Sequence, residues 1–222
     1  MTVREIVLAA AIASSLVSWS CPSLAGETTD AGAPAREQLE GPKLDGLLAE
    51  IGKARKGVKT LRAAFTQERR ITLLATSVKS RGELTFAAPD RLRWDLAPPD
   101  DVVYFIGPEG LAYKTKTSTA TVPTGGANVA RALGDVRALL TGDLAALRER
   151  YTLAASRSAT DVEISGAAKD KNASVRSFTL VLDKGLVVPI RSRLIEGKSD
   201  SIDLVFSNVV VNGPVDAARL RP

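Results

Sequence analysis

The clearest pattern along the chain is an alternation of apolar and polar residues between positions 78 and 96. Between Val78 and Phe86, every second residue lies on one side of an extended strand, and the residues on the other side are all charged or polar. The same alternation returns from Leu92 to Leu96. A period of two is typical of a strand with one buried face. Pro89 has no amide proton for a sheet ladder. We therefore predict that Ala88-Pro89-Asp90 is the turn of a hairpin.

Apolar residues at helical spacing precede this hairpin. They run from Leu44 to Leu61, are interrupted by Gly52 and Gly57, and predict an amphipathic helix before a strand that carries Phe65. Helical spacing returns from Asn128 to Leu140, and a second short helix is expected from Asp143 to Arg150. Further strands are predicted over the following segments: Val102–Ile106, Leu111–Tyr113, Lys114–Val122, Tyr151–Ala155, Val162–Ala167, Val175–Leu182, Val187–Ile195 and Ser201–Val211.

The order of these elements indicates an antiparallel architecture, because strands and helices do not alternate as they do around a parallel sheet. The turn sequences Asp183-Lys184-Gly185 and Gly197-Lys198-Ser199-Asp200 join consecutive strands as hairpins. We expect a mainly β fold with some α-helix. Its centre would be a curved antiparallel sheet that forms an unclosed half-barrel, covered by a lid of short helices.

The first 25 residues have the features of a cleaved secretory signal. Arg4 supplies an early positive charge, Ile6 to Val17 are apolar, and Ser23-Leu24-Ala25 place small residues at a cleavage site. The apolar run is shorter than the ~20 residues that span a bilayer, so a retained transmembrane helix is the weaker interpretation. Cys21 leaves a lipid-anchored chain as an alternative, although Ser18-Trp19-Ser20 fits lipoprotein signals poorly.

Three segments are therefore predicted: a signal peptide over 1–25, a flexible leader over 26–41, and a single domain over 42–222. The leader is rich in Ala, Gly, Pro, Thr and Glu and has no apolar period. Cleavage after Ala25 would remove Cys21, the only cysteine. The mature chain would then contain no disulfide.

Composition argues against an enzyme. The chain has no histidine, and without Cys21 it lacks the residues of Ser-His-Asp and Cys-His sites and the His or Cys ligands of metals. Asp100-Asp101 could pair as acid and base, but adjacent strand residues point to opposite faces and Pro98-Pro99 indicates a turn. We predict no catalytic residues, no metal and no cofactor.

The charge balance is mildly basic, with 30 Lys and Arg against 25 Asp and Glu and a net charge of +5. These residues are spread along the chain and aromatic residues make up only 5%, which argues against a nucleic-acid partner. Most of the charges are interpreted as a solvated outer sheet face. The alternative is a weak basic patch for anionic lipid or an acidic partner surface.

Two motifs resemble the periplasmic lipoprotein-carrier family, the LolA-like proteins. Phe65-Thr66-Gln67 matches the F-x-Q segment of this family, and Gly82 to Trp94 match its hairpin pattern G-x-[LF]-x-[FV]-x-x-P-x-x-x-x-W. The resemblance covers about residues 40 to 222. No single motif is decisive, but motif spacing, the order of elements and the signal peptide agree with one another.

This resemblance implies a periplasmic monomer that carries acylated outer-membrane lipoproteins in a hydrophobic cavity. The implied partners are an inner-membrane ABC-type lipoprotein-releasing complex and an outer-membrane acceptor, or the outer membrane itself. Periodicity alone favours a filled core, and only the resemblance shifts the interpretation to a cavity. The expected cavity residues are Phe65, Leu84, Phe86, Leu92, Trp94, Leu96, Tyr104 and Ile106, and the expected lid residues are Leu133, Val136, Leu139 and Leu140.

One position departs from the family pattern. Better-known members carry an arginine directly before the hairpin proline, which bonds to the lid and closes the empty cavity; here that residue is Ala88. Arg91 and Arg93 alternate with Leu92 and Trp94, so they are expected to point away from the cavity. The alternatives are a related lipid or glycolipid carrier, a lipid-anchored outer-membrane acceptor, a periplasmic lipid-sensing domain, and an interaction module with a filled core.

Overall fold

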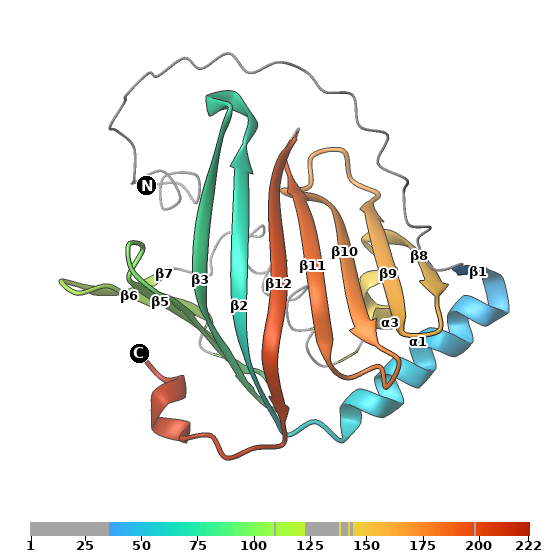
Figure 1. The fold of residues 1–222 in the computed structure, drawn as a ribbon, viewed down its shortest axis with the longest axis horizontal. Coiled ribbons are helices and arrows are strands. Elements are labelled where there is room, and N and C mark those ends of the chain that lie inside the picture. Colours follow the sequence, from blue (N-terminus) through green and yellow to red (C-terminus); the bar gives the residue numbers. More distant parts are fainter. Residues whose placement is uncertain (1–35, 109, 123–137, 139–141, 143, 198) are drawn as a thin grey trace, which may run out of the picture. The chain divides into compact units, whose positions relative to one another are not determined.

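The computed structural model describes residues 36–108, 110–122, 138, 142, 144–197 and 199–222. Twelve antiparallel strands of this part form one sheet in the order β1-β8-β9-β10-β11-β12-β2-β3-β4-β5-β6-β7 (Figure 1). The strands are β1 (Glu37–Leu39), β2 (Thr60–Ile71), β3 (Thr76–Ala87), β4 (Arg91–Leu96), β5 (Val102–Gly107), β6 (Gly110–Lys114), β7 (Thr119–Val122), β8 (Tyr151–Arg157), β9 (Asp161–Ala168), β10 (Val175–Asp183), β11 (Pro189–Glu196) and β12 (Asp200–Val211).

The sheet is not closed, since β1 and β7 stand at its two ends within the described residues. The predicted mainly β, antiparallel and unclosed architecture is therefore confirmed. The β3–β4 hairpin has the predicted turn, and the five strands predicted after residue 150 correspond to β8 to β12. The centre of the sheet joins the two halves of the chain, because β12 pairs with β2 from Ser201↔Arg70 to Val211↔Leu61.

Helix α1 (Gly41–Lys56) is the long helix of the described part. Pro42 lies in its first turn, where no amide donor is lost, and Lys53, Arg55 and Lys56 complement the partial negative charge of its last turn. The helix ends at Lys56, directly before Gly57 and earlier than the apolar spacing predicted. Leu61, counted in that spacing, lies in β2 instead, because the period has already changed to two.

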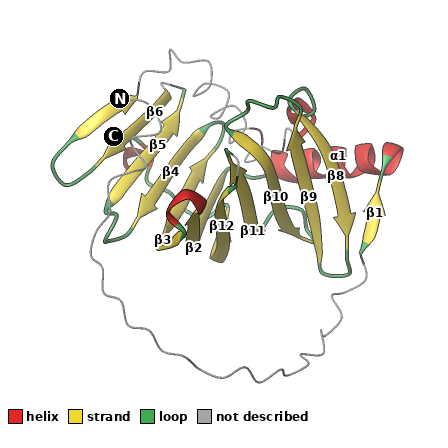
Figure 2. Ribbon diagram, turned by 90° about the horizontal axis from the view of Figure 1, so that it is seen from above, coloured by secondary structure: helices red, strands yellow, loops and turns green. Residues whose placement is uncertain are grey.

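The first core lies between α1 and the β8–β10 part of the sheet (Figure 2). The apolar stripe of the helix, Leu44, Leu47, Leu48 and Ile51, is buried there. It contacts a cluster contributed by the strands and the chain around them: Leu39, Ala138, Leu144, Leu147, Tyr151, Ala155, Val162, Ile164, Phe178, Leu180, Leu182 and Leu186. This half of the sheet is thus a filled helix-on-sheet layer.

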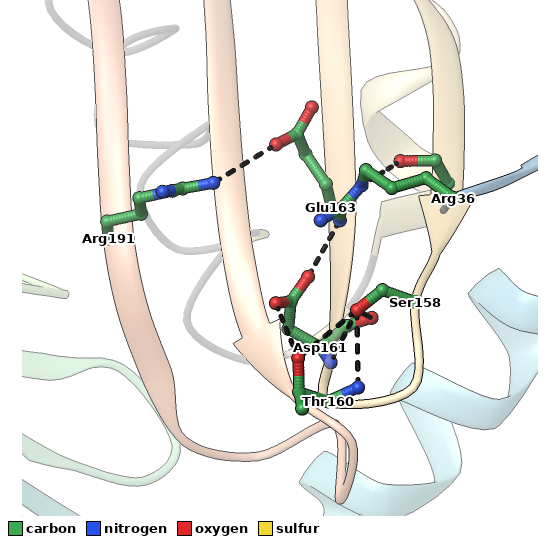
Figure 3. A network of polar contacts seen from close by, with 7 residues as sticks. Arg36, Ser158, Thr160, Asp161, Glu163 and Arg191 are labelled. Carbon is green, nitrogen blue, oxygen red and sulfur yellow. Dashed lines mark hydrogen bonds and ion pairs between the residues drawn. The ribbon is translucent and has the colours of Figure 1, made fainter. Parts of the chain in front are cut away.

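A polar network fastens β1 to the same half (Figure 3). This strand lies in the segment predicted as leader, and the sequence analysis did not identify it. Arg36 donates to Ser156 Oγ at 2.9 Å and pairs with Asp161 at 2.7 Å. The Ser158 hydroxyl accepts the amides of Thr160 and Asp161 at the β8–β9 turn. The network holds the start of the described chain against the sheet edge.

The predicted lid residues Leu133, Val136, Leu139 and Leu140 lie outside the described residues. After them the structure describes one helical turn, α3 (Leu144–Leu147), within the second predicted short helix. Two 3-10 turns, η1 (Thr72–Leu74) and η2 (Ala217–Leu220), complete the described elements. In the part of the chain with described placement, no helix has the length and apolar content needed to cross a membrane.

Candidate functional site

The candidate site is the apolar face of β2 to β5, which we call the apolar face. Strand register aligns its side chains in three rows, since residues opposite each other on neighbouring strands share a face. The rows are Leu61, Phe86, Leu92 and Ile106; Ala63, Leu84, Trp94 and Tyr104; and Phe65, Gly82, Leu96 and Val102. The structure thus brings all eight predicted cavity residues to one face.

These residues differ in burial. Phe65, Leu84, Phe86 and Leu92 are buried in the second hydrophobic cluster, whereas Trp94, Leu96 and Ile106 are partly buried and pack against it. Tyr104 is also partly buried. No residue of α1 or α3 belongs to this cluster as the described residues define it. The apolar face therefore continues beyond the layer that α1 covers.

Gly82 explains how the aromatic side chains fit together. The rings of Phe65 and Trp94 lie with their centroids 4.4 Å apart at an angle of 38°. A Cβ at Gly82 would lie 2.6 Å from Phe65 Cζ and 1.8 Å from the Asp95 carbonyl oxygen. The absent side chain lets the Phe65 ring lie over β3 and lets β4 approach closely.

Polar side chains occupy the continuation of this face toward the β2–β3 turn. Gln67 and Arg69 follow Phe65 at a period of two, and Arg69 pairs with Glu196 at 3.4 Å. Ser80 donates to Asp100 at 2.5 Å. Sequence reasoning did not identify Arg69, although the alternation through Phe65 places it on this side.

Tyr104 belongs to the middle apolar row, and its hydroxyl interacts electrostatically with two of the charged groups, Asp100 and Arg69. Its burial and then the charge of Asp100 raise the pKa of the Tyr104 hydroxyl, while the charge of Arg69 acts in the opposite direction. The hydroxyl therefore remains protonated at neutral pH and can donate a hydrogen bond. The face thus has an apolar part and a polar end with Arg69 and Tyr104 as donors.

The opposite face of the same strands is charged, and it carries the two arginines that were expected to point away from the apolar rows. Arg93 forms a two-bond pair with Asp95, at 2.7 and 2.5 Å. Its guanidinium carbon lies 5.3 Å from the centre of the Phe105 ring, and its Nη1 donates to the Arg219 carbonyl at 3.0 Å. Arg93 therefore holds the C-terminal segment, whose Leu220 is 3% exposed.

Ala88, at the position of the family's gate arginine, is exposed, and its amide donates to the Lys59 carbonyl at 2.8 Å. A different arginine is buried elsewhere in the fold, at the end of α1. Arg55 is 5% exposed and donates to the Val187 carbonyl at 3.1 Å. Burial lowers the pKa of Arg55 to about 10, and Asp183 partly opposes this, so the group stays charged at neutral pH.

Gly142 packs directly on Arg55. A Cβ at Gly142 would lie 2.9 Å from two carbons of the Arg55 side chain, and the backbone φ of +78° favours glycine there. Arg55 thus contacts the chain between the predicted lid residues and α3. The burial of Arg55 was not predicted from the sequence, because a charged residue near the end of an amphipathic helix is usually exposed to solvent.

The described residues contain no group of three or more His, Cys, Asp or Glu side chains that could hold a metal. Asp100 and Asp101 lie in the turn between β4 and β5, as predicted, and Asp101 pairs with Lys116 at 2.7 Å. The arrangement offers apolar contact and hydrogen-bond donors rather than a paired acid and base.

The chain was compared with curated protein sequences, solved structures and family models. No curated protein sequence matches this chain. Among solved structures, lipoprotein LppX from Mycobacterium tuberculosis is 18% identical, with 78% of this chain and 98% of that chain covered and a TM-score of 0.44. A LolA superfamily protein from Nitrosomonas europaea is 7% identical, with 80% and 97% covered and a TM-score of 0.42.

The complex of MucA and MucB from Pseudomonas aeruginosa is also similar, at 14% identity and a TM-score of 0.47. The comparison covers 80% of this chain and only 60% of that chain. The model of the family described as outer membrane lipoprotein carrier protein LolA matches residues 56–221, which include the whole β2–β12 part of the sheet. The chain therefore belongs to the LolA family.

Proposed function

We propose that this protein is a periplasmic carrier that binds the acyl chains of lipoproteins against the apolar face and takes them from the inner to the outer membrane. The apolar face supports this proposal, because Trp94, Leu96, Tyr104 and Ile106 remain only partly buried there beside a filled cluster. Family membership supports it. Partners of this carrier would be acylated lipoproteins, an ABC-type releasing complex and an outer-membrane acceptor.

The physical requirement for such a carrier is apolar contact. Burying one CH₂ group contributes roughly 0.8 kcal/mol, so an acylated protein leaves a membrane only if another surface replaces most of that contact. The transfer requires no bond to be made or broken. We therefore propose a binding protein and not an enzyme.

The polar end of the face gives the ligand a direction. Arg69 and the Tyr104 hydroxyl are donors, and ester and amide carbonyls of an acylated lipoprotein are acceptors. Acyl chains would lie along the partly buried Trp94, Leu96 and Ile106, with the carbonyls toward Arg69. A phosphate-bearing lipid would satisfy the same donors, which makes a carrier of another lipid the second candidate function.

A mobile lid would let the carrier release its cargo, because transfer requires weaker binding here than at the acceptor. We propose Leu133, Val136, Leu139 and Leu140 as its inner surface. Ala88 cannot make the closing bond of the family's gate arginine. Arg55 is the candidate replacement, since it is buried against Gly142 beside that segment.

Trp94 provides the direct test. It is one of two tryptophans, and the other, Trp19, lies in the predicted signal. Titration with a synthetic triacylated lipopeptide should shift the Trp94 emission and saturate. Native mass spectrometry of the purified protein should show a bound acylated species. A Trp94→Ala variant should bind more weakly, while Lys184→Ala, in the β10–β11 turn, serves as the control.

Two results would contradict the proposal. Saturable lipopeptide binding without any change at Trp94 would place the site elsewhere on the molecule. Absence of binding to any acylated ligand, by a folded protein, would favour an interaction module with a filled core. A preference for phospholipid over lipopeptide would support the second candidate function.

A further inference from the structure

The β2–β3 hairpin carries an unusual side chain at its tip. Its two strands have 12 residues each and remain paired to Ile71↔Thr76, one step beyond the last β2–β12 pair at Arg70. The chain then reverses through the 3-10 turn at Thr72–Leu74. Leu73 in this turn is 92% exposed, and the next most exposed large apolar residue of the described part, Val205, is 55% exposed.

The tip is held in a defined position. The Thr72 amide donates to Asp200 Oδ1 at 2.9 Å, and the Thr72 hydroxyl donates to the Ser199 carbonyl at 3.0 Å. Ala75 closes the turn in the left-handed region, with φ of 47°, and its amide donates to the Thr72 carbonyl at 3.1 Å. The β11–β12 turn therefore supports the tip, and Leu73 is presented outward on a braced hairpin.

Basic side chains follow directly behind Leu73. Arg70 and Lys79 are exposed on the two strands of the hairpin, and Arg81 is exposed two residues beyond Lys79 on β3. Glu68 offsets one of these charges through its 3.2 Å contact with Arg70. Val78, on the other face of β3, adds a second apolar side chain that is 37% exposed. Asp200, which accepts from the Thr72 amide, offsets a second charge. The tip thus combines a leading apolar group with three basic and two acidic side chains, a net charge of +1 among these residues.

We propose that this tip, residues 70–79 with Leu73 foremost, docks reversibly on the surface of a membrane that contains anionic lipids. A leading apolar side chain can enter the boundary between headgroups and acyl chains, while Arg70 and Lys79 remain with the anionic headgroups. One leucine and a few cations give weak binding, which suits a protein that must leave the membrane again. The inference goes beyond the proposed function, because it needs no cargo.

A membrane fits this surface better than a protein does. Stable protein interfaces bury about 800 Å² on each partner and need a matching shape. A narrow hairpin tip offers much less area, and a bilayer can deform around it. The amide and hydroxyl of Thr72 are already hydrogen-bonded, so these two groups need no partner in the headgroup region.

The test is cosedimentation of the purified full chain with vesicles of phosphatidylethanolamine and phosphatidylglycerol. We expect binding that weakens as salt is raised, and that falls about tenfold in Leu73→Glu. Val205→Glu is the matched control, since Val205 is a 55% exposed apolar residue on β12 away from the tip. It should bind as the unchanged protein does. Lys79→Glu should weaken binding only to vesicles that contain phosphatidylglycerol.

Each variant is checked by its melting temperature, and Leu73→Ser replaces Leu73→Glu if the latter does not fold. Equal binding by Leu73→Glu and the unchanged protein would overturn the proposal, as would an equal loss in Val205→Glu. Normal vesicle binding by Leu73→Glu together with lost lipoprotein release from spheroplasts would show that the tip contacts a protein, which also overturns it. Lipopeptide binding is measured separately through the Trp94 emission. A failure of the carrier function can therefore be distinguished from a failure of membrane docking by the tip.

Discussion

The rings of Phe65 and Trp94 lie with centroids 4.4 Å apart, and this contact joins β2 to β4 across the glycine of β3. Phe65 is 2% exposed, whereas Trp94 is only partly buried. Phe65 is therefore part of the packed core, whereas the Trp94 ring is accessible from the surface. This difference separates the stability of the sheet from the ability of its apolar face to bind.

Truncating the two rings should have unequal effects on stability. Phe65→Ala should lower the free energy of unfolding by about 3–5 kcal/mol, and Trp94→Ala should cost less because part of its ring is already in water. Urea unfolding followed by circular dichroism measures both. Trp94→Phe keeps an aromatic contact and should retain most of the stability. An equal cost for Phe65→Ala and Trp94→Ala would contradict the assigned burial.

Gly82 should not tolerate a side chain. Gly82→Ala would place a Cβ against the Asp95 carbonyl and the Phe65 ring, so the β3–β4 pairing must shift and stability should fall by more than about 2 kcal/mol. Gly46 in α1 is the control, since nothing lies within 4 Å of its Cβ position. Gly46→Ala should stabilise by about 0.5–1 kcal/mol. If both variants shifted the melting temperature in the same direction, the close packing around Gly82 would be refuted.

The C-terminal segment should loosen without its apolar anchor. Leu220→Ala should speed hydrogen exchange in Pro214–Pro222 and expose Phe105, because Leu220 is buried beside β5 and β6. Arg93→Ala should do the same, since it removes the bond to the Arg219 carbonyl. Arg219→Ala keeps that carbonyl and is the control. Unchanged exchange in Arg93→Ala would show that the guanidinium does not hold the segment.

Asp161 should make stability depend on pH in the acid range. Burial acts to raise the pKa of Asp161, but hydrogen bonds from Arg36, Thr160 and Ser158 outweigh it and keep the pKa below its ordinary value of 3.8. Such a group stabilises the fold above pH 3.8 and loses this contribution as the pH falls through its folded-state pKa. Asp161→Asn should therefore cost about 1–2 kcal/mol at pH 7.

This cost should shrink as the pH falls below about 3.8, where the unchanged protein also protonates Asp161. Glu163→Gln removes the weaker 3.7 Å pair with Arg191 and serves as a control with little cost at any pH. Denaturant midpoints between pH 3 and pH 7 measure both. A cost of Asp161→Asn that stays constant over this range would contradict the ionised pair with Arg36.

The proposed lid should accept a charge without global unfolding. Leu139→Glu in a packed core would cost several kcal/mol, whereas a lid that can lift brings the carboxylate to water. We expect a folded variant with faster hydrogen exchange between Asn128 and Arg150 and without lipoprotein release from spheroplasts. Leu147→Glu, in the described core, is the contrasting control and should unfold. Global unfolding of Leu139→Glu would favour a filled core.

Alternation of side chains was enough to predict much of the candidate site. Leu84, Trp94 and Tyr104 belong to three different strands, yet the period of two within each strand identified the face on which each residue lies. The short turns between these strands indicated that they pair as antiparallel neighbours. The same rule places Arg91 and Arg93 on the charged face. Local rules work here because the elements are hairpins, in which partners are close in sequence.

The mainly antiparallel fold, the apolar face and the absence of histidine chemistry follow from residue type and local period, so they can be read from the amino-acid sequence alone. Three features became visible only in three dimensions: the pairing of β2 with β12, the burial of Arg55 against Gly142, and the bond from Arg93 to the Arg219 carbonyl next to the buried Leu220. Each joins segments far apart in the chain. Such contacts are decided by how the whole sheet buries its apolar surface, and no local pattern of residues encodes that choice.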